Sequence, residues 1–204
     1  MDEKRIERVL FVGNSITKHP IAPELGWFGE WGMAASSEEK DYVHLLMREI
    51  HNYYPKANYQ SVYAAAFERS YWDYDLVRLK ELRQFEPDLI IMKIGENVND
   101  VECVERNFQH YFLRLIDYLN PTDSAAVIIV NGFWANKYIN EKIRMAAEKR
   151  RLAFVDLSSL HGQNIYMAKD QFENEGVGLH PSDVGMEEIA HLIWKEIVSL
   201  YELN

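Results

Sequence analysis

A serine, an asparagine and a histidine occupy places in this chain where acyl-transfer chemistry would need them. Ser15 ends the segment Gly13-Asn14-Ser15, Asn97 ends the segment Gly95-Glu96-Asn97, and His180 stands near the C-terminus. A serine hydroxyl supplies a nucleophile, a histidine removes its proton, and N–H donors stabilise the developing oxyanion. Each segment alone is more often a simple turn or a surface residue. The prediction of acyl transfer therefore depends on the three occurring together.

The elements that would position these residues alternate along the chain between strand-length apolar runs and segments of helical period. This alternation predicts a three-layer α/β/α sandwich with a five-stranded parallel sheet, in a single domain over residues 1–204. Ligands bind beyond the carboxyl ends of strands in such sheets, and the serine and asparagine segments directly follow the first and third strands. The predicted strands are 9–12, 60–66, 89–94, 126–130 and 153–157.

The helices are predicted from caps and from apolar residues at helical spacing. We expect the first helix to begin at a capping box made by Ser36 and Glu39, and the last to be capped by Ser182 or Asp183. Two later stripes predict core positions: Val104, Phe108, Phe112 and Leu115, and then Ile189, Ile193 and Ile197.

The composition of the chain restricts the classes of partner and cofactor that we expect it to bind. Acidic residues outnumber basic ones, 32 to 22, and the resulting net charge of −10 disfavours nucleic acid and anionic lipid. Cys103 is the single cysteine, so no intramolecular disulfide or cysteine metal cluster can form. No long apolar segment of signal-peptide or membrane-span type occurs, so we expect a cytoplasmic protein without a membrane partner. Phosphate-loop, dinucleotide and HExxH motifs are missing, and we predict no cofactor and no metal.

Aromatic residues gather near the same strand ends. The stretch 16–35 has no periodicity and is rich in glycine and tryptophan, which is typical of a functional loop. We predict that Trp27, Trp31 and Trp134 bind substrate, as an apolar wall suited to a sugar ring or an acyl group. Glu68, Arg69 and Glu96 could provide polar contacts at the rim of this wall, although charged loop residues are usually only solvated.

Three segments resemble those of the SGNH, or GDSL-like, hydrolase family, and together they span nearly the whole chain. They are Gly13-Asn14-Ser15, Gly95-Glu96-Asn97 and residues 179–183, which read Leu-His-Pro-Ser-Asp. The resemblance implies a flavodoxin-like fold with Ser15 as nucleophile and His180 as base. It also implies that the Asn97 side-chain amide and the Ser15 backbone N–H form an oxyanion hole.

The chain departs from the family pattern at two points. The family has a glycine N–H donor after the second strand, where this chain has three alanines, and we assign the role to Ala66. The family also has an aspartate three residues before the histidine, where this chain has Val177. Glu175, a backbone carbonyl or no orienting group at all could take the place of that aspartate. We favour the carbonyl or a simple Ser–His pair.

The function implied is that of a serine esterase acting on a small-molecule ester, with an acetyl group on a carbohydrate as the favoured substrate. A lysophospholipase or thioesterase of the same family is an alternative. A catalytically weak carbohydrate-binding protein on the same fold is another, because the family aspartate is missing. The sequence does not determine the oligomeric state.

Overall fold

Five parallel strands form one sheet in the order β2-β1-β3-β4-β5, in a computed structural model that describes residues 5–203. This confirms the predicted three-layer class and the predicted set of strands. The second strand was predicted too long, because the chain turns into helix α2 (Ala65–Ser70) directly after it. The strands are β1 (Arg8–Gly13), β2 (Asn58–Tyr63), β3 (Leu89–Lys93), β4 (Ala126–Val130) and β5 (Ala153–Val155).

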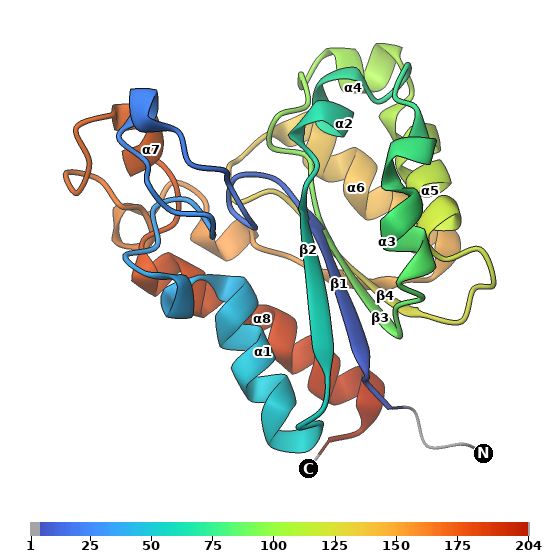
Figure 1. Cartoon of the computed structure of the whole chain (residues 1–204). Coiled ribbons are helices and arrows are strands. Elements are labelled where there is room, and N and C mark those ends of the chain that lie inside the picture. The colour runs from blue at the N-terminus through green and yellow to red at the C-terminus, as the bar shows by residue number, and fades with distance from the viewer. Residues whose placement is uncertain (1–4, 204) are drawn as a thin grey trace.

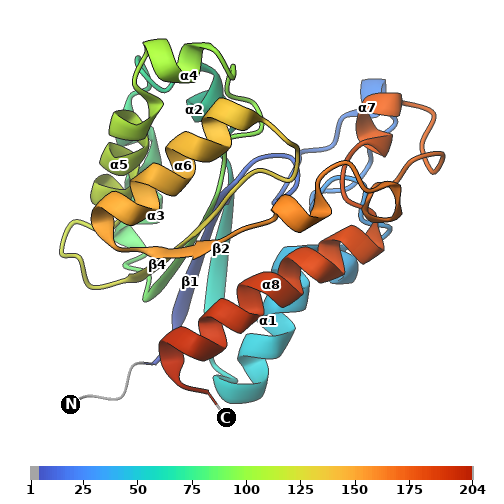
Figure 2. The same ribbon diagram turned by 180° about the vertical axis from the view of Figure 1, so that it is seen from behind.

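Helices cover both faces of the sheet (Figures 1 and 2). Helices α1 (Tyr42–Tyr53) and α8 (Asp183–Tyr201) pack together on one face. On the other face lie α3 (Lys80–Gln84), α5 (Phe108–Leu119) and α6 (Lys137–Arg150). Side chains of a strand alternate between the two faces, so Phe11 packs with the α1 and α8 side while Leu10 packs with the α5 and α6 side.

Two predicted helix boundaries need correction. Helix α1 begins at Tyr42 and not after a Ser36 and Glu39 capping box, because the buried Asp41 carboxylate accepts the His44 N–H at 2.8 Å and caps it. The Ser36 hydroxyl instead donates to the carboxylate of Asp183, 2.7 Å away.

The second correction concerns the start of helix α5. Val104 was predicted to share a buried stripe with Phe108 on one helix. Val104 belongs to the short helix α4 (Glu102–Glu105) and is 48 % exposed. Asn107 separates α4 from α5 with a left-handed φ of 50°. The last helix behaves as predicted, because the Ser182 hydroxyl accepts the Gly185 N–H and caps α8.

Two long loops pack against each other beyond the carboxyl ends of the strands. The first runs from 14 to 41 and contains only short 3-10 turns, and the second runs from 156 to 182 and includes the short helix α7 (Glu175–Gly178). A small apolar cluster joins them: Ala22, Trp27, Met33, Ala34, Ala168 and Val177. In Figure 1 the first loop and α7 lie together beside the upper end of the sheet.

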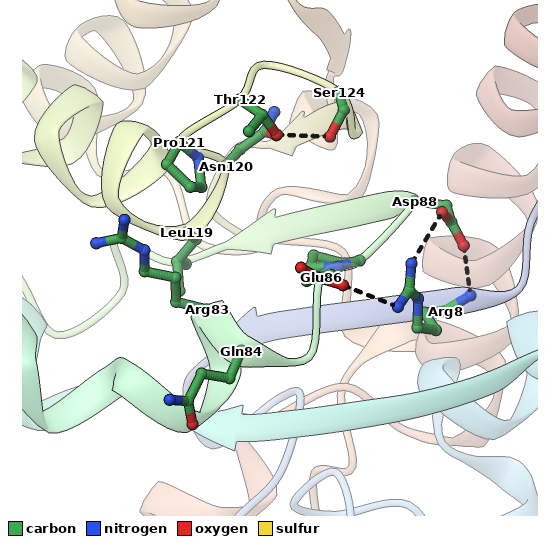
Figure 3. A pocket seen from close by; sticks show the side chains of 11 residues that line it. Arg8, Arg83, Gln84, Glu86, Asp88, Leu119, Asn120, Pro121, Thr122 and Ser124 are labelled. Carbon is green, nitrogen blue, oxygen red and sulfur yellow. Dashed lines mark hydrogen bonds and ion pairs between the residues drawn. The ribbon is translucent and has the colours of Figure 1, made fainter.

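A hollow at the opposite edge of the sheet is lined by residues that precede the strands (Figure 3). There Arg8 forms ion pairs with Glu86 and Asp88, and the Asp88 carboxylate also accepts the backbone N–H groups of Glu7 and Arg8. These contacts pair Arg8 with two carboxylates of the hollow. The hollow lies at the amino ends of the strands, away from the carboxyl ends that carry the predicted site.

Within residues 5–203, no helix is long and apolar enough to cross a membrane. No three His, Cys, Asp or Glu side chains of that range gather in a way that could hold a metal ion. Cys103 lies buried as a free thiol in the core between the sheet and α5.

Gly13 allows β1 to end in a tight turn, and its replacement by alanine should destabilise the fold. A Cβ there would overlap the Thr17 Oγ1 atom and lie 3.0 Å from the Lys93 carbonyl oxygen. We expect Gly13→Ala to lower the free energy of unfolding by about 3 kcal/mol in urea denaturation. Gly26→Ala is the control, because nothing lies within 4 Å of its added Cβ and its φ of 69° costs only about 1 kcal/mol. Equal losses for the two variants would contradict this account.

Candidate active site

Ser15 and His180 meet beyond the end of β1, although 165 residues separate them along the chain. The Ser15 Oγ atom lies 2.8 Å from the His180 Nε2 atom, and both side chains are partly buried. This is hydrogen-bond distance for a hydroxyl and an imidazole, and it is the contact that a nucleophile and its base require.

The turn that carries Ser15 is fixed by its neighbour Asn14. The Asn14 carbonyl oxygen accepts the backbone N–H groups of Thr17 and Lys18, both at 2.9 Å, which closes a single tight turn. The Asn14 side chain is fully buried, and its Oδ1 atom accepts the Ile16 N–H at 3.2 Å. Ser15 thus lies at the start of a turn whose backbone is held from both sides.

His180 is held by a backbone carbonyl where the family pattern has an aspartate. Its Nδ1 atom lies 2.8 Å from the Gly176 carbonyl oxygen, and its backbone N–H donates to the Val177 carbonyl at 2.9 Å. Val177 itself is buried in the apolar cluster between the two loops, and Glu175 lies exposed on α7. The local fold of α7 therefore supplies the acceptor that the side chain at 177 cannot.

The carbonyl determines which ring nitrogen of His180 carries the proton. A carbonyl oxygen only accepts, so Nδ1 donates to Gly176 and the neutral ring leaves the Nε2 lone pair facing Ser15. Burial lowers the pKa of His180, and the nearby His19 lowers it further, against the raising effects of Gly176 and Glu96. With a pKa below its ordinary value, His180 is neutral at pH 7 and can act as a base.

The predicted oxyanion donors lie at the neighbouring strand ends. The Asn97 side-chain nitrogen donates to the Glu68 carboxylate at 2.5 Å, and the same carboxylate accepts from the Asn14 side chain at 3.0 Å. Ala66 is exposed in the first turn of α2, where backbone N–H groups have no partner within the helix. The Ala64 N–H donates to the Gly13 carbonyl at 2.6 Å and fixes the start of α2 beside the end of β1.

Arg69 is exposed, but Glu68 and Glu96 do not lie at a solvated rim, and the expectation was wrong for these two residues. The Glu68 residue and the Glu96 side chain are each 1 % exposed, and the fully buried Lys93 forms an ion pair with Glu96. The Asn14 side chain bridges the two carboxylates, donating to Glu96 at 2.5 Å as well as to Glu68. Buried charges are tolerated when they are paired or hydrogen-bonded: Glu96 has both a cation and N–H donors, whereas Glu68 is held by N–H donors.

The pKa values of the two carboxyl groups are shifted in opposite directions. Burial and the neighbouring charge of Glu96 raise the pKa of Glu68 to about 7, although N–H donors from Gly95, Asn14 and Asn97 lower it. Burial also acts to raise the pKa of Glu96, but the Lys93 ammonium and the Phe133 N–H hold it below its usual value. Glu96 is therefore the carboxylate that stays ionised, and Glu68 is the one that can change charge near neutral pH.

Sequence reasoning missed Lys93, although a signal for it was present. Lys93 interrupts the apolar run 89–94, and a central parallel strand is buried on both faces. A lysine in such a strand needs an anionic partner, and Glu96 three residues later was the nearest one in the sequence. Attention to the charge inside the apolar run would have placed Glu96 in the interior.

The three predicted substrate-binding tryptophans have different surroundings. Trp134 is partly exposed, packs edge-to-face on the His180 ring at 5.3 Å and donates to the Leu179 carbonyl. Trp31 is partly exposed and packs against Trp27. Trp27 is only 3 % exposed and belongs to the apolar cluster between the loops. Trp134 is therefore the tryptophan that contacts the predicted base, and Trp27 contributes to packing.

The sequence matches no protein-family model, and no curated protein matches it. Solved structures are similar to it in fold. An acetylxylan esterase from Geobacillus stearothermophilus matches with a TM-score of 0.59 at 20 % identity, over 97 % of this chain and 96 % of its own. The esterase EstA from Pseudoalteromonas sp., inhibited by monoethylphosphonate, matches with a TM-score of 0.59 at 14 % identity, over 96 % of this chain and 99 % of its own.

A two-domain esterase active on acetylated mannans matches with a TM-score of 0.61 at 18 % identity, over 97 % of this chain. This chain spans only half the length of that protein. The parallel five-stranded sheet, with helices on both faces, is common to these structures. This chain therefore has the fold of the SGNH-type hydrolases.

Proposed function

We propose that this protein is a serine esterase that removes a short acyl group, acetyl above all, from a carbohydrate. The observation that carries the proposal is the pair of contacts through the His180 ring, from Ser15 Oγ to Nε2 and from Nδ1 to the Gly176 carbonyl, each 2.8 Å long. The names of the similar structures, an acetylxylan esterase and an esterase active on acetylated mannans, support the choice of acyl group and alcohol.

Acylation begins when the Ser15 Oγ atom attacks the ester carbonyl carbon and its proton passes to His180 Nε2. The Ser15 and Ala66 backbone N–H groups and the Asn97 amide stabilise the oxyanion. His180 then returns the proton to the departing sugar oxygen as the ester C–O bond breaks, and the acyl group remains on Ser15. A water molecule then attacks the acyl carbon as its proton passes to His180 Nε2. The bond from the acyl carbon to Ser15 Oγ breaks, the carboxylic acid leaves, and His180 returns the proton to the Ser15 oxygen.

The aromatic residues and the charge of the protein support an uncharged sugar as the alcohol. Trp134 and Trp31 are both partly exposed, and tryptophan rings pack well against the apolar face of a sugar. The net charge of −10 disfavours approach to anionic lipid surfaces. A neutral acetylated saccharide therefore fits the site better than a lysophospholipid.

A panel of esters tests the substrate class. We expect kcat/KM to be highest for acetyl among 4-nitrophenyl esters that run from acetyl to dodecanoyl, and we expect acetate release from acetylated xylan and mannan oligosaccharides. Ser15→Ala is the control for background hydrolysis. A preference for long acyl chains or for thioesters would contradict the proposed substrate. Saccharide binding without any turnover would contradict the proposed reaction.

Ser15 should react stoichiometrically with a fluorophosphonate probe, because an activated serine attacks phosphorus as it attacks a carbonyl. Intact-mass spectrometry should show one added label on the wild-type protein and none on Ser15→Ala. Ser36→Ala removes an exposed serine outside the site and should keep full labelling. A label that maps to another serine would refute the assignment of the nucleophile.

His180 should be essential and Glu175 dispensable, because the Gly176 carbonyl already orients the imidazole. We expect His180→Ala to lower kcat by about 10⁴ or more on an acetyl ester, the order of loss seen when a catalytic triad is disrupted. Glu175→Ala removes an exposed carboxylate and should leave kcat within about twofold. If Glu175→Ala instead lost as much activity as His180→Ala, a side-chain triad would replace the carbonyl in this mechanism.

A further inference from the structure

Glu68 is a buried carboxylate beside the predicted oxyanion site, and the reaction described above does not use it. It projects from α2 and accepts three N–H donors. Its Oε1 atom accepts from the Asn14 side chain and from the Gly95 backbone N–H, and its Oε2 atom accepts from the Asn97 side chain. One carboxylate therefore contacts the residue next to the nucleophile and the predicted oxyanion donor.

The two side-chain amides depend on Glu68 to different degrees. Asn14 has a second carboxylate partner, because its nitrogen also donates to Glu96 at 2.5 Å. The other contact of Asn97 is a long one, from Arg69 Nη2 to Asn97 Oδ1 at 3.5 Å. Loss of Glu68 would leave Asn14 anchored by Glu96, whereas Asn97 would lose its short hydrogen bond.

We propose that Glu68 is a positioning residue, which fixes the plane of the Asn97 amide so that its second N–H points at the oxyanion. This inference rests on the proposed esterase function. A side-chain amide has two N–H donors, and the Glu68 Oε2 atom accepts one of them at 2.5 Å. Rotation of the amide is thereby restricted, and the other N–H is left for the substrate. Donors that are fixed before the reaction stabilise a developing charge without reorganisation in the transition state.

The substitution Glu68→Gln would turn one acceptor atom of this side chain into a donor, with almost no change in the shape of the side chain. A carboxylate only accepts, whereas a glutamine amide has one accepting oxygen and one donating nitrogen, and all three partners of Glu68 are donors. If the glutamine oxygen faced Asn14 and Gly95, its nitrogen would face the Asn97 nitrogen. Asn97 would then flip and present its carbonyl oxygen to the glutamine, which would remove the N–H donor from the oxyanion.

Charged groups surround Glu68 on several sides. Asn14 links Glu68 to Glu96, and Glu96 is itself paired with Lys93. Arg69 contacts the Asn97 oxygen, and His180 lies near Glu96. Burial and the charge of Glu96 raise the pKa of Glu68 to about 7. A protonated carboxyl is a weaker acceptor and carries an O–H donor of its own, so the hold on Asn97 weakens when Glu68 is protonated.

A double-mutant cycle tests the proposal. We expect Glu68→Gln to lower kcat for an acetyl ester by about tenfold or more with KM within about twofold, because the interaction acts in the transition state. Asn97→Ala should lower kcat by about 10²–10³. In the Asn97→Ala background, Glu68→Gln should then change kcat by less than about twofold, because Glu68 acts through Asn97. Full activity in Glu68→Gln, or multiplied losses in the double variant, would overturn the proposal.

Asp88→Asn is the matched control, because this carboxylate likewise accepts several N–H donors, the backbone N–H groups of Glu7 and Arg8, but lies at the opposite end of the sheet. It should leave kcat within about twofold, and thermal melts of all variants measure any loss of stability. A loss of kcat in Asp88→Asn equal to that in Glu68→Gln would show a general structural effect and would overturn the positioning role.

A readout without catalysis separates this inference from the proposed function. In ¹H–¹⁵N spectra, the Asn97 side-chain amide is assigned by its disappearance in Asn97→Ala. One of its protons should be shifted downfield in the wild-type protein, lose that shift in Glu68→Gln, and move as Glu68 is titrated. An Asn97 signal that is unchanged by Glu68→Gln and by pH would overturn the proposal. If no ester is hydrolysed, the esterase function fails while this spectrum still tests the bond between Glu68 and Asn97.

Discussion

Asn14 is held between two buried carboxylates, Glu68 and Glu96, and the predicted oxyanion hole is arranged around that contact. Ser15 follows Asn14, Asn97 follows Glu96, and Ala66 lies two residues before Glu68. The same hydrogen bonds thus tie together the ends of β1 and β3 and the start of α2. Since each of these hydrogen bonds is accepted by a carboxylate, a small displacement of one of these three elements is resisted by the other two.

The charges in this network are costly to bury, and their pairing explains why they are tolerated. Removal of one partner of a buried ion pair typically destabilises a protein by about 3–5 kcal/mol, because the other charge is left uncompensated. Lys93 serves as the cation for Glu96, and Glu68 relies on N–H donors instead. Burial and the charge of Glu96 raise the pKa of Glu68 to about 7, whereas the Lys93 ammonium keeps the pKa of the equally buried Glu96 side chain below its usual value.

His180 is positioned by a different set of contacts, the packing of the two loops beyond the carboxyl ends of the strands. Val177 is buried with Trp27 in the apolar cluster that joins them, and the Ala168 N–H donates to the His180 carbonyl at 2.9 Å. An aspartate at 177 would have to leave this cluster to reach the imidazole. A hydrophobic residue there stabilises the loop, while the Gly176 carbonyl of the same short helix takes over the orientation of the ring.

The sequence by itself determined the five strands and the class of the fold, the strand ends that carry Ser15 and Asn97, and the position of His180 before the last helix. These features follow from local periodicity, turns and caps, which act over a few residues. Only the tertiary structure decided that Glu68 is buried and that the Gly176 carbonyl orients His180. Glu68 is buried by partners that lie far away in the chain, and the acceptor for His180 is set by the backbone conformation of α7. Residue types at short spacing carry no information about either.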